Sequence, residues 1–173
     1  MWKDTLFLLT SDHGLTPSHS HFDLADWMTD QGLKSVSYPV IWRRNPKSAV
    51  MISGNSFGSI HLLNHTGSHV LQDSAISNYF GQDRINELLQ QDAVDFIAYR
   101  ADRTGEIIVQ NRLGKAIIGL TGDRYFYQPL TADPLSLGPL VLNGHRDALE
   151  ATFQTDYPDA LVQLTDLFKS RRA

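Results

Sequence analysis

The sequence predicts an α/β fold in which a sheet is flanked by helices and carries a small inserted antiparallel unit. Three features support this prediction. Leu6 to Leu9 form an apolar run without polar alternation, which is typical of a parallel strand covered on both faces. Apolar residues with helical spacing follow from Phe22 onward. Four short strand candidates then succeed one another between residues 94 and 128, joined by polar turns.

The first helix is expected where Leu24, Trp27 and Met28 recur at i, i+3 and i+4. Ser20 is a candidate N-cap for this helix, and Gly32 marks its end. These residues would place one helix directly after the apolar run.

Two short strands and a further helix are predicted next. The strands cover Ala49 to Ile52 and Ser59 to Leu63, on either side of a turn at Gly54-Asn55. Ile85, Leu88 and Leu89 form one apolar stripe, which predicts a helix over Asp83 to Gln91.

The following region is expected to form an antiparallel meander, as an inserted subdomain over residues 94–128. Its strand candidates are Val94–Tyr99, Glu106–Val109, Lys115–Leu120 and Arg124–Tyr127. The proline-rich tract from Pro129 to Pro139 is expected to be a loop. Two helices should follow it, over His145–Phe153 and Pro158–Ser170, the second with Pro158 at its first position.

Composition places the chain among ordinary globular proteins. Its 173 residues suit one α/β domain over 1–173, with 42% hydrophobic and 20% charged residues. The net charge of −4 argues against a surface that wraps nucleic acid, although Arg43, Arg44 and Lys47 form either a local basic patch or a solvated loop. The absence of cysteine excludes disulfides and thiolate ligands. No apolar run reaches transmembrane length, so no membrane contact and a default cytoplasmic location are expected, with the oligomeric state left open.

Asp12 and His13 stand where the apolar run ends, within Thr5 to Gly14. Thr10 and Ser11 signal emergence from the core, and Gly14 allows the backbone to turn so that both side chains can reach one ion. A carboxylate and an imidazole are ordinary ligands of a divalent ion such as zinc. The alternative is a capping carboxylate beside a hydrogen-bonded histidine.

The string Ser-Asp-His-Gly, preceded by an apolar strand and followed by Leu15 and a Thr-Pro turn, resembles the metal-binding signature of the alkaline phosphatase superfamily. It is most similar to the branch of type I phosphodiesterases and nucleotide pyrophosphatases. The resemblance implies an alkaline-phosphatase-like sheet, two divalent ions, zinc or manganese, and a phosphorylated small-molecule substrate such as a phosphodiester or nucleotide. It also implies that Asp12 and His13 are metal ligands and that the reaction is metal-assisted phosphoester hydrolysis.

The chain lacks several sequence motifs of that family. The family's nucleophile and Asp-x-x-x-His pair precede Ser-Asp-His-Gly, yet only eleven residues precede Asp12, and no Asp-x-x-x-His occurs. The late Gly-x-His-Gly motif is also absent, with Gly144-His145 as its nearest echo. We therefore expect the chain to be an internal part of a longer enzyme, to contain no catalytic nucleophile and to be inactive alone.

Weaker site candidates lie nearby. His19 and His21 could chelate if their loop folds back, although solvated histidines are more common on such loops. Asn55 could donate its amide to a phosphate oxygen, or it could serve only as a Gly-Asn turn. The competing hypothesis from another functional class is a non-catalytic binding or regulatory module in which Asp12-His13 is structural.

Overall fold

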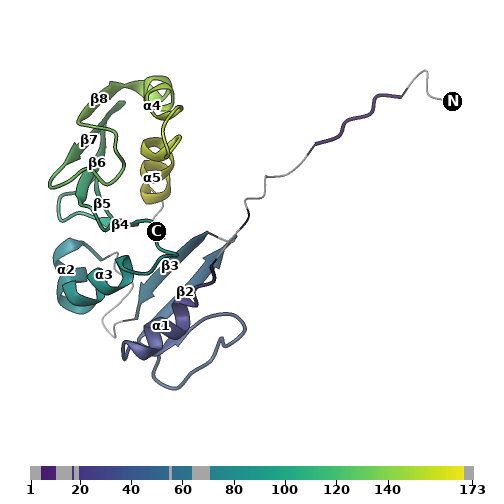
Figure 1. Cartoon of the computed structure of the whole chain (residues 1–173), viewed down its shortest axis with the longest axis vertical. Coiled ribbons are helices and arrows are strands. Elements are labelled where there is room, and N and C mark those ends of the chain that lie inside the picture. Colours follow the sequence, from purple (N-terminus) through teal and green to yellow (C-terminus); the bar gives the residue numbers. More distant parts are fainter. Residues whose placement is uncertain (1–4, 11–16, 18–19, 55, 64–70, 170–173) are drawn as a thin grey trace.

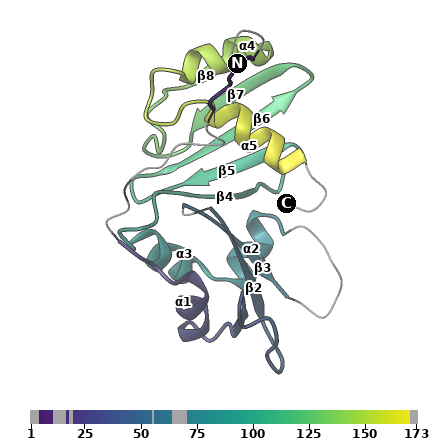
Figure 2. The ribbon, with the colours of Figure 1, turned by 90° about the vertical axis from the view of Figure 1, so that its right-hand side faces the viewer.

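The chain forms a mixed α/β fold with two sheets in its computed structural model, which describes residues 5–10, 17, 20–54, 56–63 and 71–169. A three-stranded sheet and its helix make up the N-terminal part, and a five-stranded sheet with two helices makes up the C-terminal part. Two further helices lie between the two sheets in both views (Figure 1 and Figure 2). The α/β prediction is confirmed at this level.

The N-terminal sheet is mixed in direction. It consists of β1 (Ser35–Val36), β2 (Ser48–Ser53) and β3 (Phe57–Leu62), in the order β1-β2-β3. β1 is parallel to β2, whereas β2 and β3 form an antiparallel hairpin. The two strands predicted around Gly54 are therefore confirmed as a pair.

Helix α1 (Leu24–Asp30) packs on this sheet through Met28, which is fully buried. The helix starts later than predicted, because its N-cap is Asp23 and not Ser20: the Asp23 carboxylate accepts a hydrogen bond from the Asp26 amide at 2.9 Å. Gly32 follows the helix with φ of +78°, a conformation that favours glycine, as the sequence predicted.

Two short helices connect the sheets. α2 (Asp73–Tyr79) was not predicted, because its seven residues show no long apolar stripe. α3 (Gln82–Leu89) agrees closely with the predicted helix, and Ile85, Leu88 and Leu89 are buried. Ile85 and Leu89 join Met28 and Val50 in one apolar cluster, so α3 completes the core of the N-terminal sheet.

The C-terminal sheet is an antiparallel meander in the order β4-β5-β6-β7-β8. Its strands are β4 (Ile97–Arg100), β5 (Glu106–Gln110), β6 (Lys115–Thr121), β7 (Arg124–Pro129) and β8 (Leu140–Asn143). All four predicted strands are present. β8 extends the sheet beyond the predicted region, because the chain returns after the proline-rich loop and pairs with β7.

Strand alternation divides this sheet into two faces. Ile107 and Val109 of β5 point to one face, where α4 (Gly144–Thr152) and α5 (Ala160–Lys169) cover a core that includes the fully buried Leu161. Ile108 points to the other face and packs with Tyr99 and Ala101. The helix predicted from Pro158 begins only at Ala160 and the two helices otherwise lie where expected.

The buried parallel strand predicted at Leu6 to Leu9 is not formed. No strand is assigned to residues 5–10, and the four apolar side chains are between 77% and 98% exposed. The segment extends away from the two sheets (Figure 1). An apolar run becomes a buried strand only where neighbouring elements cover both of its faces, and in this fold other segments complete both sheets.

Candidate functional site

The structure places few of the residues that the sequence singled out. Asp12, His13, His19 and Asn55 lie outside the described residues. His21 is described and exposed, and it lies three residues before α1. Among the described residues, no three histidine or acidic side chains come together in a group that could hold a metal ion.

A different polar cluster forms on the C-terminal sheet, on the face that carries Ile108. Cross-strand register explains its position: Gln110 of β5 pairs directly with Lys115 of β6, so both side chains leave the same face. Tyr99 of β4 lies opposite Ile108, one pair farther along that face. The sheet thus brings a phenol, a carboxamide and an ammonium group together beside α2.

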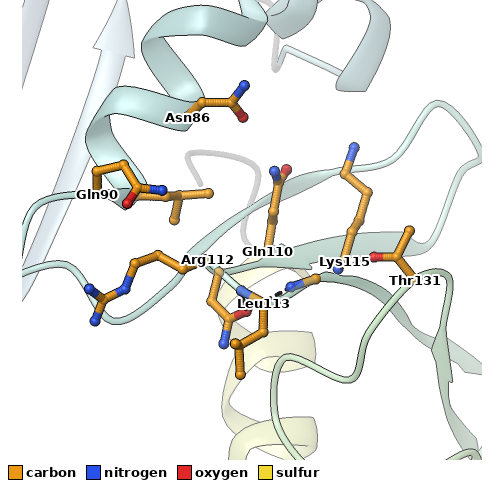
Figure 3. A pocket seen from close by; sticks show the side chains of 10 residues that line it. Asn86, Gln90, Gln110, Arg112, Leu113, Lys115 and Thr131 are labelled. Carbon is orange, nitrogen blue, oxygen red and sulfur yellow. Dashed lines mark hydrogen bonds between the residues drawn. The ribbon is translucent and has the colours of Figure 1, made fainter.

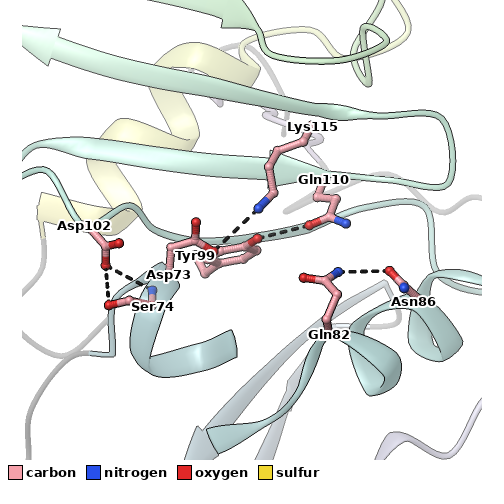
Figure 4. Close-up of polar contacts among 8 residues, drawn as sticks. All are labelled: Asp73, Ser74, Gln82, Asn86, Tyr99, Asp102, Gln110 and Lys115. Carbon is pink, nitrogen blue, oxygen red and sulfur yellow. Dashed lines mark hydrogen bonds and ion pairs between the residues drawn. The ribbon is translucent and has the colours of Figure 1, made fainter. Parts of the chain in front are cut away.

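Lys115 and Asp73 connect the sheet to the first turn of α2. The Lys115 Nζ lies 3.5 Å from the Asp73 Oδ1 and 5.6 Å from the centre of the Tyr99 ring. Tyr99 in turn donates its hydroxyl hydrogen to the Gln110 Oε1 at 3.0 Å. Figure 4 shows these groups meeting between the sheet and the helix. Each side chain in the cluster is therefore held by at least one partner from another element.

The electrostatics of the cluster favour a neutral Tyr99. Burial of the phenol raises its pKa strongly, and the adjacent Asp73 carboxylate adds to this shift. The Asp73 Oδ1 is itself buried without a hydrogen-bond partner, so its main compensation is the charge of Lys115. Tyr99 consequently acts as a hydrogen-bond donor and not as a base at neutral pH.

Asp102 fixes the other side of the first turn of α2. Its Oδ1 accepts hydrogen bonds from the Ser74 amide at 3.0 Å and from the Ser74 hydroxyl at 2.8 Å. These two bonds hold the pKa of Asp102 below its usual range. The loop after β4 thereby anchors α2 against the sheet, which keeps Asp73 near Lys115.

A cleft of about 340 Å³ opens beside this cluster, between α3 and the turn that joins β5 to β6. Asn86 of α3 and Gln90, the C-cap of that helix, border it opposite Gln110 and Lys115 from the sheet (Figure 3). The remaining lining residues are Leu89, Asn111, Arg112, Leu113, Gly114 and Thr131. Four carboxamides and two cations line the cleft without any acidic side chain.

The lining is partly preorganised. The Asn86 Oδ1 accepts a hydrogen bond from the Gln82 side-chain Nε2 at 3.0 Å, and the Asn111 Oδ1 accepts from the Leu113 and Gly114 backbone amides in the β5–β6 turn. Amides and cations of this kind donate hydrogen bonds to anionic or hydroxylated small molecules. The arrangement is suited to binding rather than to proton transfer, since Tyr99 stays protonated and Lys115 is paired with Asp73.

Sequence reasoning missed this cluster because its members carry no motif. Alternation along the predicted strands was the available signal, since it places residues 108 and 110 on one face. The register that adds Tyr99 and Lys115, and the unpredicted helix that brings Asp73, become visible only in the folded chain.

The fold and the cleft define a mixed α/β protein with a polar cleft between a helix and an antiparallel sheet. No protein-family model matches this chain, and comparison with curated proteins and with solved structures likewise finds no significant match.

Proposed function

We propose that this chain is part of a metal-dependent phosphoester hydrolase similar to the type I phosphodiesterases and nucleotide pyrophosphatases of the alkaline phosphatase superfamily. The observation that supports the proposal is the string Ser11-Asp12-His13-Gly14 directly after an apolar run. Its expected substrate is a phosphodiester or nucleotide. The motif supports metal-assisted phosphoester hydrolysis, and it does not determine which organic group the substrate's phosphate carries.

Asp12 and His13 would hold one of two divalent ions, because a carboxylate oxygen and an imidazole nitrogen suit zinc or manganese. A bound ion of this kind polarises a phosphoryl oxygen and stabilises developing charge. Within the described residues His21 joins no group of three ligands, so it remains a weaker candidate along with His19. Asn55 would donate its side-chain amide to a phosphate oxygen.

Metal titration of the whole chain tests the assignment. Calorimetry with zinc and with manganese is expected to show weak binding, which Asp12→Asn and His13→Gln each reduce by about tenfold or more. His145→Gln, at the start of α4, is the matched control and should leave the affinity unchanged. Metal binding that neither Asp12→Asn nor His13→Gln weakens would contradict the proposal.

Activity assays test the same assignment by measuring turnover. With nitrophenyl phosphate and bis-nitrophenyl phosphate, the chain alone is expected to show no enzymatic turnover, because catalytic groups act as a unit and a nucleophile is missing from the recognised motif. Turnover that persists through purification and disappears in Asp12→Ala would show that these residues hold a complete site.

The cleft between α3 and the β5–β6 turn favours a second candidate, a non-catalytic module that binds a small anion. Arg112 and Lys115 bring positive charge to the lining, which includes no acidic side chain. Their ion-pair partners, Asp92 at 3.7 Å and Asp73 at 3.5 Å, lie outside the lining, so an anion in the cleft would share these cations with them. Thermal unfolding with inorganic phosphate or adenosine monophosphate should then show a ligand-dependent rise in Tm that Lys115→Met abolishes. Lys34→Met, beside β1, is the control. Equal stabilisation of the two variants would exclude the cleft as the site.

A further inference from the structure

Charge is distributed very unevenly along the sequence. Residues 31–72 contain Lys34, Arg43, Arg44 and Lys47 but no aspartate or glutamate. The rest of the chain contains 11 lysines and arginines against 19 acidic residues. The acid-free region includes the whole N-terminal sheet and the loop 37–47 that joins β1 to β2. The segment 31–72 is therefore cationic, whereas the acidic side chains that most closely precede it in sequence are the exposed Asp23, Asp26 and Asp30 of α1 and its N-cap.

The same loop exposes large apolar side chains. Tyr38 is 91% exposed, Ile41 is 75% exposed and Trp42 is 81% exposed, with Val40 beside them at 45%. The backbone around them is folded into a compact turn, in which the Ser37 amide donates to the Val40 carbonyl at 3.1 Å and the Ile41 amide donates to the Pro39 carbonyl at 3.0 Å. A contiguous group of exposed aromatic and aliphatic residues is typical of an interaction surface.

The cations follow these residues directly. Arg43 is tied back to the protein, because its Nη1 donates to the Thr29 Oγ1 of α1 at 3.2 Å. Arg44 and Lys47 are exposed, and within the described part of the chain neither forms an ion pair with a carboxylate. The loop thus has an apolar tip, an anchored base and two cations available to a partner.

We propose that loop 37–47 binds the surface of an anionic lipid bilayer. Tyr38, Ile41 and Trp42 enter the interfacial region, where tyrosine and tryptophan side chains are favoured. Arg44 and Lys47 contact lipid phosphate and carboxylate groups at the level of the headgroups. The association is peripheral, and it departs from the sequence-based expectation of no membrane contact, which rested on the length of apolar runs.

An anionic bilayer accounts for the residues of this loop better than a nucleic acid does. Aliphatic Val40 and Ile41 offer no flat surface on which a nucleic-acid base can stack, whereas both fit among acyl chains. The apolar residues and the cations are also neighbours within one short loop, so both can reach the same bilayer surface.

Vesicle sedimentation of the whole chain is the main test. We expect binding to phosphatidylcholine vesicles that contain about one quarter phosphatidylserine and little binding to phosphatidylcholine alone. Trp42→Ala combined with Ile41→Ala should lower the partition coefficient by about tenfold or more. Arg44→Gln and Lys47→Gln should each lower it about fivefold, which corresponds to about 1 kcal/mol per basic residue near an anionic surface. Phe153→Ala is the control, because Phe153 is similarly exposed but caps α4.

Fluorescence gives a second readout that locates the contact. The chain has three tryptophans, and Trp27 packs beside Phe80 in the N-terminal core. Anionic vesicles should shift the emission to the blue in the native chain, and the shift should be lost in Trp42→Phe although this variant still binds. Circular dichroism checks that each variant keeps the native fold.

Three outcomes would overturn the proposal. Equal binding to vesicles with and without phosphatidylserine would show that Arg44 and Lys47 do not act. A blue shift with an oligonucleotide but not with vesicles would assign the loop to nucleic acid. A doubling of mass in sedimentation that Trp42→Ala abolishes, without vesicle binding, would assign it to a second copy of the chain.

Discussion

The two sheets differ in how completely their faces are covered. In the C-terminal sheet, twelve buried apolar residues gather between the strands and helices α4 and α5. In the N-terminal sheet, five gather around α1 and α3, while Met51 and Ile52 of β2 are each more than 60% exposed. Because apolar burial is the main source of folding stability, the C-terminal part should carry most of it. The exposed N-terminal part is correspondingly available for contacts with other molecules.

The largest effect is expected from Leu161→Ala. Leu161 is fully buried on α5 against the C-terminal sheet, so the truncation should reduce the free energy of unfolding by about 2–5 kcal/mol. Urea denaturation measures this change. Leu167→Ala, on the same helix but 38% exposed, serves as the control and should cost far less. Similar losses in both variants would mean that burial on α5 does not set stability.

Met28→Ala tests whether the two parts unfold separately. Met28 is as well buried as Leu161, but it belongs to the smaller cluster of the N-terminal sheet. Amide hydrogen exchange should accelerate in α1, β2 and β3, while protection in β5, β6 and β7 is retained. Equal loss of protection in both sheets would show that they unfold as one unit, which would break the comparison.

Gly114→Ala tests how closely the β5–β6 turn packs against the loop that follows β7. A Cβ atom at this position would lie 2.0 Å from the carbonyl oxygen of Ala132, which cannot move as a side chain can. We expect a loss of about 1–3 kcal/mol in unfolding free energy. Gly122→Ala is the control for backbone strain alone, because its φ is +65° and no atom lies within 4 Å of the new Cβ. A smaller loss at Gly114 than at Gly122 would contradict the steric argument.

Asp133→Asn probes the proline-rich loop beside β7. Asp133 accepts hydrogen bonds from the Tyr127 hydroxyl and from the Leu135 and Gly138 amides. Burial works to raise the pKa of Asp133, but these hydrogen bonds outweigh it and the pKa is lowered. We expect a loss of about 1–2 kcal/mol at neutral pH, since hydrogen bonds to a charged acceptor are replaced by weaker ones.

The pH dependence of this loss has a definite sign. A carboxylate whose pKa is lower in the folded state stabilises the protein above its unfolded pKa, and that stabilisation disappears as the pH falls through the folded value. The difference between native chain and Asp133→Asn should therefore be constant near neutral pH and shrink in acid. Thermal unfolding across this range measures it, and a difference that grows in acid would contradict the assignment.

Local patterns identified the elements whose partners are close in sequence. The strands from Ile97 to Pro129 follow one another through short turns, so alternation and turn residues were enough to predict the meander. The stripe of Ile85, Leu88 and Leu89 identified α3 in the same way. In these cases the contacts that stabilise an element are made by its immediate neighbours.

Predictions failed where a distant or competing group determines the outcome. α5 was expected from Pro158, but Asp159 has φ of +61°, and its amide donates to the Thr152 Oγ1 at 3.0 Å. Thr152 is buried at the end of α4, so packing between the two helices sets where α5 begins. Similarly, Asp23 replaced Ser20 as the cap of α1 because its carboxylate reaches the Asp26 amide.

The two candidate sites differ in the same way: a local sequence pattern marks one, whereas the other depends on contacts between distant residues. The Asp12-His13 pair was found from sequence alone, because metal ligation by adjacent residues leaves a recognisable string, and its role remains a prediction. The cluster of Asp73, Tyr99 and Lys115 left no string, because cross-strand register and the docking of α2 bring together residues up to 42 positions apart.

The sequence by itself determined that the chain forms short helices and an antiparallel meander, since these depend on side-chain periodicity and turn chemistry. Tertiary structure decided which apolar residues are buried: Ile118 lies in the core, whereas Leu6 to Leu9 are exposed although they form the most continuous apolar run near the start of the chain. The physical reason is that apolarity is a property of one residue, whereas burial requires other elements to cover it.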